Sequence, residues 1–232
     1  IMNPTILGEF YHTGFRRHKE GLELEAENPG RAICNTAWDP RMGDKGLEDL
    51  ERECSERKIQ GVKLYTAEWQ GDSRGYSLAD AATYRYLEKS EELGIKNVHV
   101  HKGPTVWPLD RDAFDVHDVD HVATDFPNLN FIVEHIGLPR LEDFCWIATQ
   151  EPNVYAGMAV AMPFIHSRPR YFAQIMGELL YWIGEDKILF GSDYAIWTPR
   201  WLIEKFLSFD IPEDMQAEYG FACMFISHDL AV

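Results

Sequence analysis

Three short apolar segments of the sequence end in side chains that could bind a metal ion. They read NVHVH, NFIVEH and KILFGSD, and their last residues are His101, His135 and Asp193. Two imidazoles and one carboxylate that converge at one rim form a ligand set for Zn²⁺ or another divalent cation. Such a metal would lower the pKa of a bound water, and a carboxylate beside it could accept the proton.

The residues next to these candidates are assigned by alternation along a strand. His99 and His101 point to the same face, whereas Glu134 and His135 should point to opposite faces. Only one of the latter pair can then face the site, and we expect it to be His135, with Glu134 toward the helix layer beside a cation. His99 either lines the pocket or fills the core while it donates to a neighbour.

Asp193 has a competing role as the cap of the helix that follows it. Thr198 and Pro199 already provide a start for that helix, so capping explains Asp193 poorly. Its place after the last strand favours a metal ligand that also acts as general base.

Other polar and aromatic residues are candidates for substrate contact. His12 lies in a long loop near Arg16 and Arg17, where a solvated loop is the alternative. His166 follows a strand and could meet a substrate carboxylate together with Arg168, or could cap the next helix. The remaining candidates are Lys63, Tyr194 and Trp197, and the aromatic residues suit an apolar or aromatic-acid pocket unless they only pack.

The segments that carry these residues belong to an alternation of short apolar strands and amphipathic helices. We expect strands at 31–37, 61–66, 97–101, 130–136, 153–160 and 187–191, with residues 1–4 as the end of one more. Helices are expected at 47–57, 78–93, 113–126, 141–149, 169–183 and 199–206, the second capped by Ser77 and ended by Gly94.

This alternation predicts a parallel sheet covered by helices, either an open doubly wound sheet or a closed (β/α)₈ barrel. No GxGxxG or GxxxxGK[ST] motif follows a strand, which removes the commonest nucleotide-binding folds. Because the ends of the strands are polar, we favour the α/β class with a TIM barrel, in which function gathers at the carboxyl ends of the strands.

The amino-acid composition limits the kinds of molecule that the protein is expected to bind. The 232-residue chain has a net charge of −16, which argues against nucleic acid or an anionic membrane surface as a partner. Its four cysteines show no CxxC spacing, so we expect reduced thiols in a cytoplasmic protein rather than disulfides or a zinc ribbon. The expected partner is a small-molecule substrate, with a homo- or hetero-oligomer possible.

The strings NVHVHKG, FIVEHIGLP and ILFGSDYAIW resemble the amidohydrolase superfamily, in the branch that includes aminocarboxymuconate semialdehyde decarboxylase and related aromatic-acid decarboxylases. The resemblance implies a distorted barrel and a divalent metal, zinc first and manganese or iron as alternatives. It places His101, His135 and Asp193 around that metal, with Asp193 and His135 as catalytic residues. The implied chemistry is hydrolysis or non-oxidative decarboxylation. Lys63 could be carbamylated to bridge two metals, but a structural lysine paired with a barrel carboxylate explains it better.

The family's first strand supplies a His-x-His pair that the sequence does not show. Counted backward, the segments present correspond to strands two to eight, so residues 1–220 are expected to form one incomplete barrel domain. Residues 221–232 form an atypical tail. Alternatives to the metal-dependent enzyme are a non-catalytic or truncated barrel that binds a partner chain, and an iron or mixed-metal oxygenase built on the same site.

Overall fold

The structure is a computed structural model that describes residues 19–57, 59–105, 107–194 and 196–218. The chain divides into two compact units, Ile1–Tyr155 and Ala156–Val232. Strands run parallel and follow one another in chain order, β1-β2-β3-β4-β5-β6. This order is that of a β/α repeat, in which each strand is joined to its neighbour by a helical crossover.

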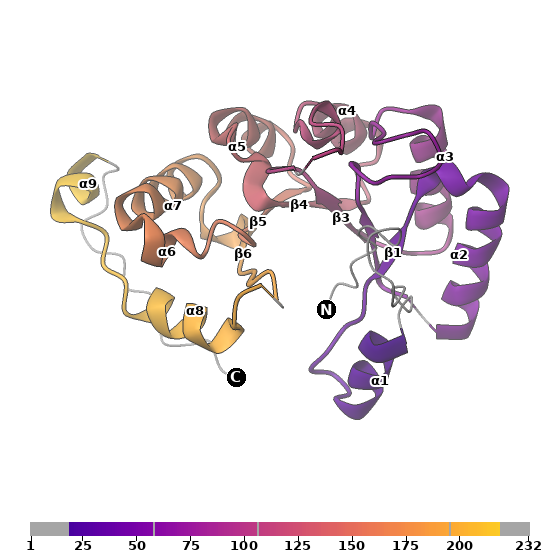
Figure 1. Cartoon of the computed structure of the whole chain (residues 1–232), viewed down its shortest axis with the longest axis horizontal. Helices are drawn as coiled ribbons and strands as arrows, with labels where there is room; N and C mark the ends of the chain where they lie inside the picture. The colour runs from indigo at the N-terminus through magenta and orange to yellow at the C-terminus, as the bar shows by residue number, and fades with distance from the viewer. Residues whose placement is uncertain (1–18, 58, 106, 195, 219–232) are drawn as a thin grey trace. The chain divides into compact units, whose positions relative to one another are not determined.

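Among its described residues, the first unit contains four whole strands, with helices before, between and after them. The strands are β1 (Thr36–Trp38), β2 (Gly61–Leu64), β3 (Asn97–His101) and β4 (Asn130–Glu134). The helices are α1 (Lys19–Glu27), η1 (Pro40–Met42), α2 (Gly43–Arg57), α3 (Ala81–Glu92), η2 (Asp112–Phe114), α4 (Asp118–Asp125), η3 (His135–Gly137) and α5 (Leu141–Gln150). Figure 1 shows α2, α3, α4 and α5 along one side of these strands.

Two faces of this sheet differ in chemistry. One face is apolar and is buried completely or nearly so; it carries Val62, Leu64, Val98, Val100, Phe131 and Val133. Helices α2 to α5 bury apolar residues of their own, such as Leu50, Leu87, Val119 and Phe144, so this is the face that they cover. The opposite face, called here the polar face, carries Asn35, Lys63, His99, His101 and Glu134, as the pairings Lys63 with His99 and His101 with Glu134 require.

The second unit packs around the long helix α7. Strand β5 (Val154–Gly157) crosses the boundary between the units and pairs with β6 (Ile188–Leu189) through Ala156 and Gly157. The remaining elements are α6 (Phe164–Ser167), α7 (Pro169–Ile183), η4 (Glu185–Lys187), α8 (Pro199–Leu207) and α9 (Glu213–Glu218). Phe172 of α7 meets the rings of Phe206 and Phe209 edge-on, with centroids 6.3 and 5.1 Å apart.

Predicted strands and helices are found in the predicted order, with corrections at their ends. The strand predicted at 31–37 is Thr36–Trp38, because the preceding backbone turns onto α1 through the bond from Cys34 N to a Glu25 carboxylate oxygen. Helix α3 begins after Asp80 rather than Ser77, and Gly94 follows it with φ +74° as predicted. Helices α1, α6 and α9 were not predicted.

The helix predicted at 113–126 is divided into η2 and α4. The break lies at Asp115, whose carboxylate accepts the backbone N–H of His117, a local bond that competes with helix formation. The predictions for residues 1–4 and 221–232 fall outside the described residues. That residues 1–220 form one domain stays a prediction.

Across the described part of the chain, no helix combines the length and the apolar character that a membrane crossing requires.

Candidate functional site

His101 and His135 meet at the carboxyl ends of β3 and β4. Nε2 of His135 lies 3.2 Å from Nδ1 of His101, and both side chains are buried. Two nitrogens that bind one zinc at about 2.0–2.1 Å in tetrahedral geometry are about 3.3 Å apart. The two nitrogens form a hydrogen bond in this structure, and their separation also fits two ligands of one metal ion.

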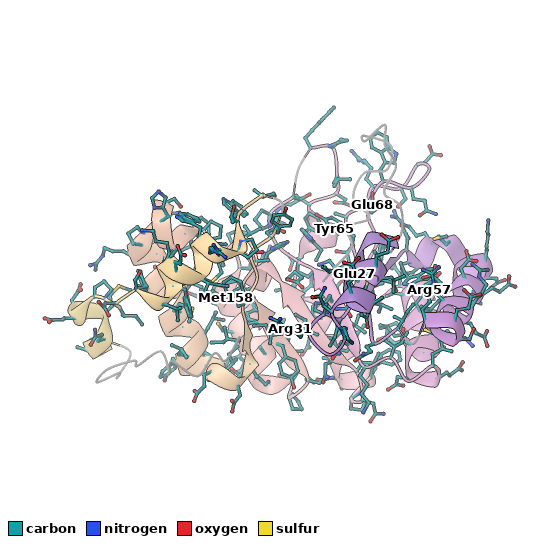
Figure 2. The ribbon with its side chains drawn as sticks, turned by 90° about the horizontal axis from the view of Figure 1, so that it is seen from below. Glu27, Arg31, Arg57, Tyr65, Glu68 and Met158 are labelled. Carbon is teal, nitrogen blue, oxygen red and sulfur yellow. The ribbon has the colours of Figure 1, made fainter. Side chains whose placement is uncertain are left out.

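Aromatic rings hold His101 in place. The Tyr65 ring, which follows β2, has its centroid 3.9 Å from that of the imidazole, and the Phe114 ring lies at 4.6 Å. Figure 2 labels Tyr65 and Glu68 on this segment after β2. The hydroxyl of Thr66 donates to the His101 carbonyl at 3.0 Å, which fixes the end of β3 against the same segment.

Burial keeps His101 neutral. It lowers the pKa of the imidazole well below its ordinary value, and the nearby His135 and Lys63 lower it further, against a hydrogen bond to the Pro104 carbonyl that raises it. A nitrogen that donates to a carbonyl carries the ring's one proton, so the other nitrogen keeps its lone pair for a metal or a donor. The neutral form is the one that binds metals.

The backbone at the end of β4 differs from the sequence prediction. Glu134 and His135 were expected to diverge, but His135 and Ile136 have φ values of +68° and +49°, which end the strand and return His135 to the polar face. Such a conformation is unusual for residues other than glycine. Gly103 makes room for it, since a Cβ built on Gly103 would lie 2.7 Å from the Cβ of His135.

Glu134 also faces the polar side, so its assignment to the helix layer was wrong. It pairs with His101 in the register of β3 and β4, and its Oε1 lies 2.8 Å from Nδ1 of His99. Burial raises the pKa of Glu134, but the charge of Lys63 and the bond with His99 outweigh this and lower that pKa to about 2. Glu134 is thus a buried carboxylate at neutral pH, and the cation that acts on it, Lys63, lies on the polar face rather than in the helix layer where it was expected.

Two features of this region were not predicted from the sequence. Asn35, just before β1, donates from Nδ2 to Nε2 of His99 at 3.0 Å, and it is 64 residues away in the chain. Lys102, completely buried, donates to Oδ2 of Asp118 at 3.0 Å and to the Ala113 carbonyl, and its Nζ lies 2.8 Å from Oδ1 of Asp118 as an ion pair. A charged residue directly after a buried strand, as in His101-Lys102, was the available signal for the second feature.

The remaining predicted residues belong to the second unit or lie outside the described residues. Asp193, half-buried, follows β6 with φ +53°, and its carbonyl accepts the N–H of Ile196. It does not cap α8, whose N-cap residue is Thr198. His166 is exposed and meets Trp201 edge-on, Tyr194 is exposed and Trp197 is half-buried. His12 is outside the described residues.

Gly191, two residues before Asp193, lies at a close backbone contact. A Cβ built there would lie 2.6 Å from the backbone nitrogen of Ala159, so the chain passes the segment after β5 too closely for a larger residue. In the described ranges, no group of three or more His, Cys, Asp or Glu side chains is close enough to hold a metal ion. Among the described residues of the first unit, the His101–His135 pair is the candidate donor set.

The parallel β/α order and the polar strand ends define a TIM-barrel type of protein, and comparisons agree. A sequence model of the family described as amidohydrolase matches residues 7–220. The chain belongs to the amidohydrolase family, a family of enzymes. No curated protein matches the sequence.

Solved structures show the same fold. An uncharacterised TIM-barrel protein from Bordetella bronchiseptica matches with TM-score 0.62 at 19% identity, over 89% of this chain and 69% of its own. A dihydroxybenzoic acid decarboxylase from Polaromonas, with bound manganese and the inhibitor 2-nitroresorcinol, matches with TM-score 0.57 at 18% identity, over 86% and 70%. A Pseudomonas putida protein assigned as a 2-pyrone-4,6-dicarboxylic acid hydrolase matches with TM-score 0.56 at 16% identity, over 89% and 78%.

Proposed function

We propose that the chain is a metal-dependent hydrolase or non-oxidative decarboxylase that acts on a small carboxylate or amide-type substrate. The observation that carries this proposal is the buried His101–His135 pair, with its 3.2 Å separation between ring nitrogens. Membership of the amidohydrolase family supports it, as does the likeness to a manganese-containing decarboxylase.

In this proposal His101 and His135 bind a divalent metal, zinc first and manganese or iron as alternatives, and Asp193 provides a carboxylate ligand. When bound, the metal polarises a substrate oxygen and makes water a stronger acid. Asp193 accepts a proton from water or substrate and returns it to the product. His135 orients the reacting group as well as binding metal.

The substrate would be recognised by polar and aromatic side chains. Lys63 and His166 offer a positive charge or a hydrogen-bond donor to a carboxylate, and Tyr194 and Trp197 offer flat apolar surface. His12 completes the candidate set of substrate contacts, whereas both ring nitrogens of His99, the other predicted contact, are already engaged by Asn35 and Glu134. The proposed partner is a small-molecule substrate. Assembly with further copies of this chain or with another chain is compatible with the proposal.

Metal content and turnover test the proposal together. The purified protein, incubated with Zn²⁺ or Mn²⁺ and desalted, should retain about one metal ion per chain by elemental analysis. His135→Ala should lose it, because one imidazole remains where two are needed. Asp193→Asn should reduce turnover of a panel of hydroxybenzoates and 2-pyrone-4,6-dicarboxylate by at least about 10²-fold, the usual contribution of a general base.

The matched control is His121→Ala, which removes an exposed histidine from α4 in the same unit. It should keep wild-type metal content and turnover. Full activity in Asp193→Asn, or a wild-type protein that retains no divalent metal, would contradict the proposed function.

A further inference from the structure

The side chain of His99 is engaged at both ring nitrogens. Nδ1 lies 2.8 Å from Oε1 of Glu134, and Nε2 lies 3.0 Å from Nδ2 of Asn35. A ring with both nitrogens occupied has no lone pair left for a metal or a substrate. This favours the second of the two alternatives for His99, a buried residue that bonds to its neighbours.

The two bonds join three strands next to the histidine pair. Asn35 immediately precedes β1, His99 lies in β3 and Glu134 ends β4. Each bonded residue is close in sequence to a member of the pair: His99 is two residues before His101 on the same face, and Glu134 directly precedes His135. The bond between them is diagonal, because the residue opposite Glu134 in the register is His101.

The His99–Glu134 bond therefore lies next to the residues whose positions set the distance between His101 and His135. His135 leaves the strand in a left-handed conformation, so the β ladder does not continue to fix its position. The Glu134 side chain and the Lys102 N–H, which donates to the Glu134 carbonyl at 3.3 Å, hold the last regular residue before that turn. Lys63 lies on the same face of the sheet, opposite His99 in the register of β2 and β3.

We propose that His99 and Glu134 are positioning residues whose hydrogen bond, anchored by Asn35, sets the separation of His101 and His135. This inference rests on the proposed metal function for its consequence, which is metal affinity, but not for the geometry itself. Residues that orient metal ligands from outside typically contribute 10- to 100-fold to affinity.

The first measurement is made on metal-free protein, so that it does not depend on the proposed function. Imidazole NMR signals of His101 and His135, assigned with single His variants, should shift in His99→Ala and in Glu134→Gln. They should be unchanged in His121→Ala, which carries the same loss of a ring on an exposed helix position. Unchanged His101 and His135 signals in both test variants would overturn the proposal.

The second measurement uses Co²⁺ as the probe, through its visible absorption. His99→Ala and Glu134→Gln should each weaken Co²⁺ binding by about 10-fold or more and change the band positions, while His121→Ala should do neither. Because the two residues act through one bond, the double variant should be little weaker than the worse single variant. Abolition of the Co²⁺ spectrum by His99→Ala, as complete as in His135→Ala, would show that His99 is itself a ligand and overturn the proposal.

Circular dichroism identifies variants that fail to fold, and His99→Gln tests whether the hydrogen bond to Glu134 is what matters. Glutamine can still donate to Glu134, so His99→Gln should recover part of the Co²⁺ affinity that His99→Ala loses. Equal losses in the two variants, both folded, would count against the proposal. Absence of Co²⁺ binding by the wild-type protein would contradict the proposed function alone, because the NMR comparison still decides the positioning role.

Discussion

At the scale of single residues, the site depends on backbone angles and glycines that side-chain patterns do not display. His135 turns back to the polar face with φ +68°, and Gly103 leaves the space for its Cβ. Both Glu134 and His135 then face the same side, although they are adjacent in a strand segment. The geometry of the His101–His135 pair therefore depends on the backbone at His135 and Gly103 as well as on the two imidazoles.

Gly103→Ala should displace His135 and weaken metal binding. The added Cβ would lie 2.7 Å from the Cβ of His135, closer than such atoms approach, so one backbone segment must move. We expect at least a 10-fold loss of Zn²⁺ affinity by competition with a chromophoric chelator. Gly71→Ala is the control, because its φ of +57° strains alanine by about 1 kcal/mol while nothing lies within 4 Å of the new atom. Equal affinities in the two variants would contradict the steric argument.

The buried carboxylate of Glu134 predicts a loss of stability in acid. Its pKa falls from 4.5 to about 2 in the folded protein, so it contributes stability that is present above pH 4.5 and is lost as the pH falls toward 2. By linkage, the contribution is on the order of 3 kcal/mol. Glu134→Gln should be less stable at neutral pH but should lose less of its free energy of unfolding between pH 4.5 and 2. The exposed control Glu88→Gln should follow the wild-type curve in urea titrations across that range, and an unchanged acid limb in Glu134→Gln would contradict the assignment.

At the scale of elements, the segments after β2 and β3 are fastened to α4 by one buried ion pair. Asp118 of α4 accepts from Lys102 after β3 and from Ser77 and the backbone of Leu78, which precede α3. Lys102 is completely buried, and burial lowers its pKa while the charge of Asp118 opposes this. The pair holds together the segments that carry the polar strand ends.

Lys102→Met should be strongly destabilising, because it leaves Asp118 buried without its cation. Removal of one partner of a buried pair costs about 3–5 kcal/mol, measured here as the free energy of unfolding in urea. The exposed pair of Arg85 and Asp44 is the control, and Arg85→Ala should cost less than about 1 kcal/mol. The double variant Lys102→Met/Asp118→Leu should be less destabilised than the sum of its single variants. A loss below about 1 kcal/mol in Lys102→Met would contradict this role.

At the scale of the whole molecule, metal binding and folding should be linked. A ligand that binds only the folded chain adds about 2.7 kcal/mol at a concentration 100 times its Kd, which corresponds to a rise in Tm of about 5–10 °C. We expect Zn²⁺ to produce this rise in the wild-type protein, as measured by scanning calorimetry, and EDTA to reverse it. His101→Ala should show the same Tm with Zn²⁺ and with EDTA, whereas His121→Ala should respond as the wild type does. A Zn²⁺-dependent rise that survives in His101→Ala would place the metal elsewhere.

The sequence by itself determined the order of strands and helices, because each has its own hydrophobic period and turn residues. It also determined that His101, His135 and Asp193 lie at or after the ends of strands, and that the chain resembles the amidohydrolase superfamily. Only the tertiary structure decided that Glu134 and His135 both face the polar side, because the positive φ of His135 requires the room that the missing side chain of Gly103 leaves. The partners of His99 were likewise decided there: Asn35 and Glu134 are 64 and 35 residues away in the chain, and sheet register brings them together. Local pattern carries no information about such pairings, since they follow from which strands become neighbours.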